Sequence, residues 1–247
     1  MTDDAIYGSV DQTAEVISLV TREPVEGDDS AGASGWLRRL CRTASHDLPA
    51  SGVGVSLLST AGELVTAAAS DARSVSVEEL QFTLGEGPCL AAHEARAPVL
   101  VPDLRVMANS AWPAYAPAAE NHGVAAVFAF PMQIGSARLG VLDVYRDRTG
   151  ELSAPALARA MTYADVAMRR LLDTPEQPSA LDSLVTDATD GRLQVYQAQG
   201  MVMVQLDVSL DEALARIRAH AYAYDRSIGE VADDIIARRI TLERDGR

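Results

Sequence analysis

The chain has 247 residues, a formal net charge of −14 and 21 basic residues, every one of which is arginine. This length suits two domains, and the acidic balance argues against a broad basic surface for non-specific nucleic-acid binding. Without lysine, the chain cannot use a P-loop lysine, a Schiff-base lysine or a Ser–Lys pair.

Several absences predict a cytoplasmic protein. The N-terminus, Met1–Asp4, is acidic and lacks the cationic and apolar pattern of a secretory signal. The apolar stretch near Val124–Phe130 is too short to span a bilayer. Cys41 and Cys89 are too few for a disulfide framework, and no CxxC pair or Cys/His cluster indicates zinc. We therefore expect no membrane partner, no metal site and no cofactor.

Changes in composition divide the chain into segments. Residues 24–35 are small, acidic and glycine-rich, which indicates a mobile linker. Residues 173–179 contain two prolines in a polar setting, which indicates a helix stop and a hinge. The predicted segments are an N-terminal helix with the linker (1–35), a first domain (36–173), a hinge (174–179) and a second domain (180–247).

The first domain alternates between strand and helix patterns. Strands are predicted, in chain order, at 53–59, 63–70, 99–101, 123–132 and 138–146. Helices are predicted from Trp36, at 75–82, at 88–94, within 109–121 after a loop, and at 153–172. The last two strands flank a turn at Gly135 and are expected to form a central hairpin. The last helix is expected to start after the cap Ser153 and to bury Leu157, Met161, Ala164, Met168 and Leu171. The pattern predicts an α+β domain with helices packed on an antiparallel sheet.

Three segments carry a family resemblance. Leu84–Cys89 reads LGEGPC, Ala97–Leu104 reads APVLVPDL, and Leu139–Tyr145 reads LGVLDVY. With these segments, residues from about Asp11 to Asp173 resemble the GAF sensor domain. The resemblance implies a pocket for a small molecule between the sheet and its covering helices and loops, or a role in dimerisation, and it leaves the ligand unknown.

The second domain has a helical pattern throughout. Ser209 and Ser227 are each followed three residues later by glutamate and then by an apolar run, which predicts two capped helices. Upstream, small and apolar residues recur at spacings of three and four, which predicts a longer helix with a pairing seam. The seam residues are Leu181, Leu184, Ala188, Gly191, Val195, Ala198 and Val202.

This pattern resembles the ANTAR domain, an all-α, three-helix RNA-binding module of bacterial antitermination regulators. The matching segments are 197–203 (QAQGMVM), 209–213 (SLDEA), 217–221 and 225–232. The family's Ala-Lys-Gly is replaced here by Ala198-Gln199-Gly200, which removes a positive charge. Residues 179–247 also contain 12 acidic residues and 8 arginines. RNA affinity must therefore come from a local arginine cluster or from avidity in a dimer.

The resemblance and the side-chain chemistry together give the candidates for RNA contact. Arginine stacks on unpaired bases and forks onto phosphates, and tyrosine can offer a stacking surface. The candidates are Ala198, Gln199, Gly200, Arg192, Arg216, Arg218, Tyr222 and Arg226, with Tyr224 as a second stacking surface. For Gly200, close packing of another helix is an equal alternative, and surface ion pairs are an alternative for Arg218 and Arg226.

The predicted function is that of a signal-responsive regulator and not of an enzyme, because no catalytic constellation is visible. A homodimer is expected to bind structured RNA, such as the paired hairpins of a transcript leader, and to control antitermination. The GAF domain would sense a small-molecule ligand or the dimer state. One alternative is a DNA-binding helix-turn-helix at 210–224 and 228–239. A second is a redox sensor or enzyme acting through Cys89, with His93 four residues on. A third is a module that has lost RNA binding at Gln199.

Overall fold

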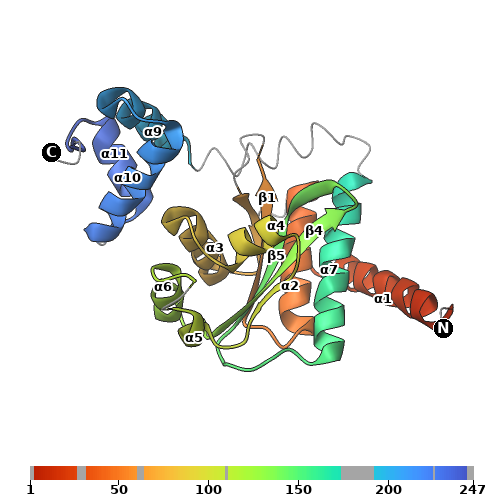
Figure 1. Cartoon of the computed structure of the whole chain (residues 1–247). Helices are drawn as coiled ribbons and strands as arrows, with labels where there is room; N and C mark the ends of the chain where they lie inside the picture. Colours follow the sequence, from red (N-terminus) through yellow and green to blue (C-terminus); the bar gives the residue numbers. More distant parts are fainter. Residues whose placement is uncertain are drawn as a thin grey trace. The chain divides into compact units, whose positions relative to one another are not determined.

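The structure is a computed structural model that describes residues 3–26, 32–59, 64–108, 111–173, 192–224 and 226–243. It consists of two compact units, an α+β unit followed by an all-helical unit (Figure 1). The helices of the first unit are α1 (Asp3–Arg22), α2 (Ala33–Asp47), α3 (Ala72–Leu84), α4 (Pro88–Ala95), α5 (Leu104–Ala108), α6 (Tyr115–Asn121) and α7 (Ala154–Leu172). Its strands are β1 (Gly52–Leu58), β2 (Leu64–Ala69), β3 (Val99–Val101), β4 (Ala126–Ile134) and β5 (Ala137–Arg146). The second unit contains α9 (Leu193–Leu206), α10 (Leu210–Ala223) and α11 (Ile228–Ile236).

The five strands form one antiparallel sheet in the order β2-β1-β5-β4-β3. As predicted, β4 and β5 form a hairpin within the sheet, and Gly135 in their turn has a φ of 60°. Glycine adopts this left-handed conformation without the steric cost that a Cβ would add. The predicted fold class is confirmed. Among the described residues, no helix combines the length and the apolar character that a membrane span needs.

Alternation along the strands gives the sheet two different faces. One face is apolar and packs against α2 and α7. Its residues include Val53, Val55, Leu57, Phe128, Phe130, Met132, Leu142 and Val144. On the other face, Gly54, Asp143 and Ala129 lie side by side in register on β1, β5 and β4. A carboxylate is thus placed in the middle strand of the sheet, on the face opposite the main apolar core.

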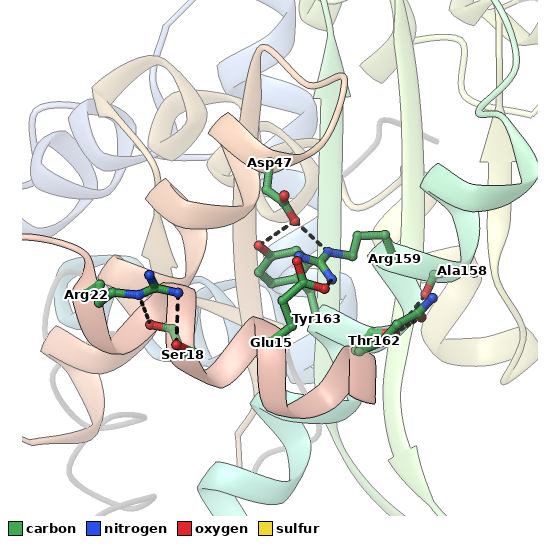
Figure 2. A network of polar contacts seen from close by, with 9 residues as sticks. Glu15, Ser18, Arg22, Asp47, Ala158, Arg159, Thr162 and Tyr163 are labelled. Carbon is green, nitrogen blue, oxygen red and sulfur yellow. Dashed lines mark hydrogen bonds and ion pairs between the residues drawn. The ribbon is translucent and has the colours of Figure 1, made fainter. Parts of the chain in front are cut away.

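A polar network joins three helices on the apolar side (Figure 2). Arg159 on α7 donates from Nε to Asp47 Oδ2 on α2 at 2.6 Å and from Nη1 to Glu15 Oε2 on α1 at 2.7 Å. The hydroxyl of Tyr163 donates to the same Asp47 oxygen at 2.9 Å. Since Val16 and Val20 of α1 also lie in the main core, α1 packs as part of the first unit.

Helix α7 begins as predicted, and Ala164, Met168 and Leu171 are buried as predicted, with Leu157 partly buried against the core. The Ser153 hydroxyl accepts a hydrogen bond from the Ala156 N–H at 3.4 Å. Met161 is 50% exposed, so its predicted burial is wrong. Ala160, Tyr163, Val166 and Ala167 are buried as well, so the core-facing side of the helix is wider than predicted and leaves out Met161.

The second unit is a bundle in which α9 packs against α10 and α11. Val195, Ala198 and Val202, three residues of the predicted pairing seam, are buried in this bundle. Within α9 the seam therefore fills the core of the bundle and does not face outward. The other seam residues lie outside the described residues.

The two predicted capping boxes differ. Ser227 and Glu230 form both reciprocal hydrogen bonds at the start of α11. Ser209 accepts from the Glu212 N–H at 3.1 Å, but the Glu212 carboxylate pairs with Arg216 at 2.9 Å instead of reaching back. A charged partner four residues on outcompetes a neutral backbone N–H for this carboxylate.

Candidate functional site

The first candidate site is a buried cluster on the second face of the sheet. It brings together Glu78 from α3, Cys89 from the start of α4 and Asp143 from β5, and all three side chains are buried. The strand opposite makes room for them, because a Cβ at Gly54 would lie 2.0 Å from Glu78 Oε1. The cluster therefore depends on a glycine in β1 as well as on the acidic groups.

Hydrogen bonds from neutral groups hold the two carboxyl groups in place. Glu78 accepts from the Tyr145 hydroxyl at 2.6 Å and from the Ser56 hydroxyl at 2.7 Å. The Gln81 amide nitrogen donates to Asp143 Oδ2 at 3.4 Å, and its oxygen accepts from the Cys89 N–H at 2.8 Å. Gln81 thus couples the start of α4 to the middle strand.

Burial controls the protonation of the cluster. Burial raises the pKa of Asp143 well above its ordinary value, and the nearby Glu78 raises it further. Burial also raises the pKa of the Cys89 thiol, with Asp143 as the next largest cause. The thiol is therefore protonated at neutral pH, although a helix N-terminus by itself favours a thiolate. This argues against Cys89 as a redox-reactive nucleophile.

The LGEGPC segment positions these groups. Gly85 and Gly87 have φ values of 71° and 145°, which favour glycine. Between them, the Glu86 carboxylate accepts from the backbone N–H groups of Ala114 at 2.6 Å and Tyr115 at 2.8 Å. The segment therefore ties the start of α6 to the start of α4, and it fixes Tyr115 in the interior.

Glu78, Tyr115 and Asp143 are not among the site residues predicted from the sequence. The usable signal was in β1, where Gly52, Gly54 and Ser56 alternate with valines. Three small residues on one face of a strand indicate close approach of another group.

Two surface clefts of the first unit are lined by residues outside this cluster. One has a volume of about 420 Å³ and is lined in part by Arg105, Arg148 and Asp147. The other, of about 260 Å³, is lined in part by Phe130 and Met161. The first volume is within the range of small-molecule sites, so this unit has room for a ligand at its surface.

The second candidate site is in the helical unit, where the predicted RNA-contact residues separate into two groups. Arg192, Ala198 and Gln199 are buried. The Gln199 amide donates to the Leu210 carbonyl at 2.9 Å and so links α9 to the start of α10. These positions support the packing of the bundle.

The arginines of α10 do not form one cluster. Arg216 and Arg218 are two residues apart, which places them about 200° apart around the helix. Arg216 pairs with Glu212, and Arg226, after α10, pairs with Asp234 at 2.7 Å. The guanidinium groups of Arg216 and Arg226 are therefore held by carboxylates.

The exposed candidates gather at the C-terminal end of α10. Tyr222 is 64% exposed and Tyr224 is 66% exposed. The Tyr224 ring lies 4.5 Å from the His220 ring, centroid to centroid. Arg226 follows two residues later and is partly exposed. Each of these exposed aromatic rings is a suitable surface for an unpaired base.

Helix α9 has a separate exposed face. Leu193 and Val204 are 59% and 74% exposed, and Gly200 falls on the same side of the helix. A Cβ at Gly200 would meet no atom within 4 Å, so packing within the chain does not require glycine there. This face lacks a partner among the described residues.

Comparisons with known proteins agree with this architecture. A GAF domain profile matches residues 36–171, and an ANTAR domain profile matches residues 185–236. The GAF domain of a Coxiella burnetii phosphoenolpyruvate-protein phosphotransferase is 16% identical, with a TM-score of 0.50, over 66% of this chain and 92% of that one. A free methionine-R-sulfoxide reductase from Thermoplasma acidophilum is 19% identical, with a TM-score of 0.43, over 63% of this chain and 94% of that one. No match was found among curated proteins.

Proposed function

The chain belongs to the GAF domain family and has an ANTAR domain after its GAF domain, and from this architecture we propose that it is an RNA-binding antitermination regulator. The GAF domain senses a small molecule or the dimer state. The ANTAR domain binds a structured transcript leader. The mechanism is binding and not chemistry, consistent with the protonated, buried Cys89 thiol.

The observation that carries the proposal is the pair of exposed tyrosines at the end of α10. Unpaired bases stack on exposed aromatic rings of this kind. Arg226, two residues after Tyr224, can exchange its carboxylate partner Asp234 for a phosphate. We therefore assign RNA contact to Tyr222, Tyr224 and Arg226.

The position of Gln199 argues against a module that has lost its RNA site. Because the Gln199 side chain is buried and bonds to Leu210, it serves the α9–α10 contact. The missing charge at position 199 is then compatible with an RNA surface formed at the end of α10.

A DNA-binding helix-turn-helix is less compatible with α11. In that arrangement the second helix enters the major groove. Helix α11 has Glu230, Asp233 and Asp234 and no arginine. Glu230 and Asp233 would repel DNA phosphates if α11 entered the groove, whereas Asp234 is already paired with Arg226 and Arg239.

The class of nucleic acid can be tested directly with the full chain. We expect binding to a library of RNA stem-loops with randomised loops to exceed binding to duplex DNA of the same stem. Each base stacked on an aromatic ring contributes about 1–3 kcal/mol, or roughly 5- to 150-fold in affinity. Filter retention measures both Kd values at one salt concentration. Equal or tighter binding to the duplex DNA would contradict the proposal.

We further propose that the exposed face of α9 forms the homodimer contact. Leu193 and Val204 supply apolar surface, and Gly200 between them permits close approach of a second helix. Glycine inside a helix costs about 0.5–1 kcal/mol relative to alanine, so an external contact gives a reason for it.

The double substitution Leu193→Glu with Val204→Glu is expected to convert the protein to a monomer, because it places four carboxylates in the dimer contact. Sedimentation velocity measures the change. The control is Val106→Glu on α5, which adds a charge at an exposed valine of the GAF domain. A wild-type monomer, or a double variant that stays dimeric, argues against this face.

A further inference from the structure

The buried cluster of the GAF domain has the composition of a metal site. The carboxylate oxygens of Glu78 and Asp143 and the sulfur of Cys89 all lie within 4.8 Å of one another. They come from three different elements, α3, β5 and α4, so the fold and not a local sequence motif brings them together.

A second, independent feature is the Tyr115 hydroxyl. Tyr115 is completely buried, and its hydroxyl has no hydrogen-bond partner among the described residues. The ionisable groups of Asp143, Glu78 and Cys89 act electrostatically on it, so the hydroxyl is in the neighbourhood of the cluster. Leaving a buried polar group without a partner costs about 1–3 kcal/mol.

Asp143 has few partners outside the cluster. Its Oδ2 accepts from Gln81, and its carboxyl group also interacts with Cys89 and Glu78, but its buried Oδ1 receives no hydrogen bond from outside the cluster within the described part of the chain. An unpartnered hydroxyl and this oxygen, beside two further metal-binding side chains, are the arrangement that an additional bound group would satisfy.

We propose that Glu78, Cys89 and Asp143 bind a divalent transition-metal ion, with the Tyr115 hydroxyl as the fourth ligand. One sulfur and oxygen donors suit zinc and its neighbours, whereas magnesium and calcium take oxygen ligands only. Four protein groups without an open position form a closed site, which is typical of structural zinc. The proposal concerns the GAF domain alone and does not depend on RNA binding.

The distances permit this coordination after a small contraction. Bonds of about 2.0 Å to oxygen and 2.3 Å to sulfur place the donor atoms of a tetrahedral site roughly 3.3–3.6 Å apart. The donor atoms here stand within 4.8 Å of one another, which leaves little space for an organic ligand between them.

Binding exchanges protons for the metal ion. In the metal-free protein the thiol and at least one carboxyl group are protonated. On binding, these protons pass to solvent, and two carboxylates and one thiolate surround a +2 ion. The net charge of the coordinated group is −1. The +2 charge of the metal ion compensates the cost of burying the two carboxylates and the thiolate. In the metal-free protein this cost is avoided only because protons neutralise the groups.

The test uses the full chain and Co²⁺ as the probe, because cobalt bound to a thiolate absorbs in the near ultraviolet. The protein is unfolded in urea with a chelator, refolded in Co²⁺ and freed of excess metal by gel filtration. We expect one retained ion per chain and a thiolate-to-cobalt absorption band. Circular dichroism verifies that each sample has refolded.

Two ligand variants and one control test whether the retained ion is bound at this cluster. Cys89→Ser is expected to lose the band, and Asp143→Asn, which has the same shape as the native residue, is expected to retain less than about a tenth of the ion. Cys41→Ser is the matched control, because Cys41 is buried in the core on the other face of the sheet. It is expected to retain both the ion and the band.

Each outcome decides the proposal. If folded wild-type protein retains no stoichiometric ion, the buried acids hold protons only and the proposal is wrong. It is also wrong if Asp143→Asn retains as much ion as wild type, or if Cys41→Ser and not Cys89→Ser loses the band. If Cys89→Ser fails to refold, the Asp143→Asn result decides.

Discussion

Replacing Asp143 by asparagine is expected to stabilise the metal-free protein at neutral pH. Asp143 is buried next to Glu78, and burial raises its pKa well above the value of 3.8 that it has when unfolded. Folding at pH 7 must therefore either bind a proton or bury an additional charge. Asparagine has nearly the same shape and no charge, so it removes this cost and can donate from its amide to Glu78.

The effect should increase with pH. Below pH 3.8 the carboxyl group is protonated in both states and the ionisation of Asp143 contributes nothing. Above this pH the unfolded chain releases the proton while the folded protein keeps it. The free energy of unfolding then falls by about 1.4 kcal/mol per pH unit until the pH passes the folded-state pKa. The increase in the free energy of unfolding caused by Asp143→Asn should therefore grow with pH by the same amount per pH unit.

Urea unfolding in the presence of a chelator at pH 5, 6, 7 and 8 measures this dependence. Both tryptophans, Trp36 and Trp112, lie in the GAF domain, so their fluorescence reports on that domain. Asp147→Asn is the matched control, because Asp147 follows β5 directly and is exposed. Its effect should be within about 0.5 kcal/mol at every pH. Parallel pH curves for wild type and Asp143→Asn would refute the argument.

The strands of the GAF domain could be predicted from the sequence because alternation is a local signal. The buried cluster could not be predicted in this way. Glu78 and Asp143 are far apart in the chain, and carboxylates normally lie at the surface. Their burial depends on Gly54 of β1, which pairs with Asp143 on β5. Because Gly54 has no side chain, Glu78 has room to lie over β1 next to Asp143. Metal-binding motifs are recognised by ligands that lie close together in the sequence. A cluster whose residues come from three separate elements has no such motif.

In the ANTAR domain, the sequence predicted the existence of the helices better than the direction of their side chains. The caps at Ser209 and Ser227 are local and were correctly placed. Which face of α9 turns inward depends on how α9 packs against α10 and α11, and this packing buries Gln199. The resemblance to a family motif does not say which face of α9 is buried. The packing role of Gln199 therefore could not be predicted before the structure.

Replacing both Tyr222 and Tyr224 by alanine is expected to weaken RNA binding by about 10-fold to more than 100-fold. The two rings are exposed at the end of α10, so their truncation removes stacking surface and leaves the core of the bundle intact. The change in the stability of the domain should stay within about 0.5 kcal/mol per position. The Kd is measured by fluorescence anisotropy with an RNA stem-loop selected by the wild-type protein.

The matched control replaces the same two residues by phenylalanine. Phenylalanine keeps the aromatic face and loses only the hydroxyl group, so the Kd should change by no more than about two-fold. If the phenylalanine pair loses as much affinity as the alanine pair, hydrogen bonding and not stacking binds the RNA. If the alanine pair binds as tightly as wild type, the end of α10 is not the contact surface. Binding must then involve another face of the ANTAR domain, and that face does not include Arg192 or Gln199, which are buried.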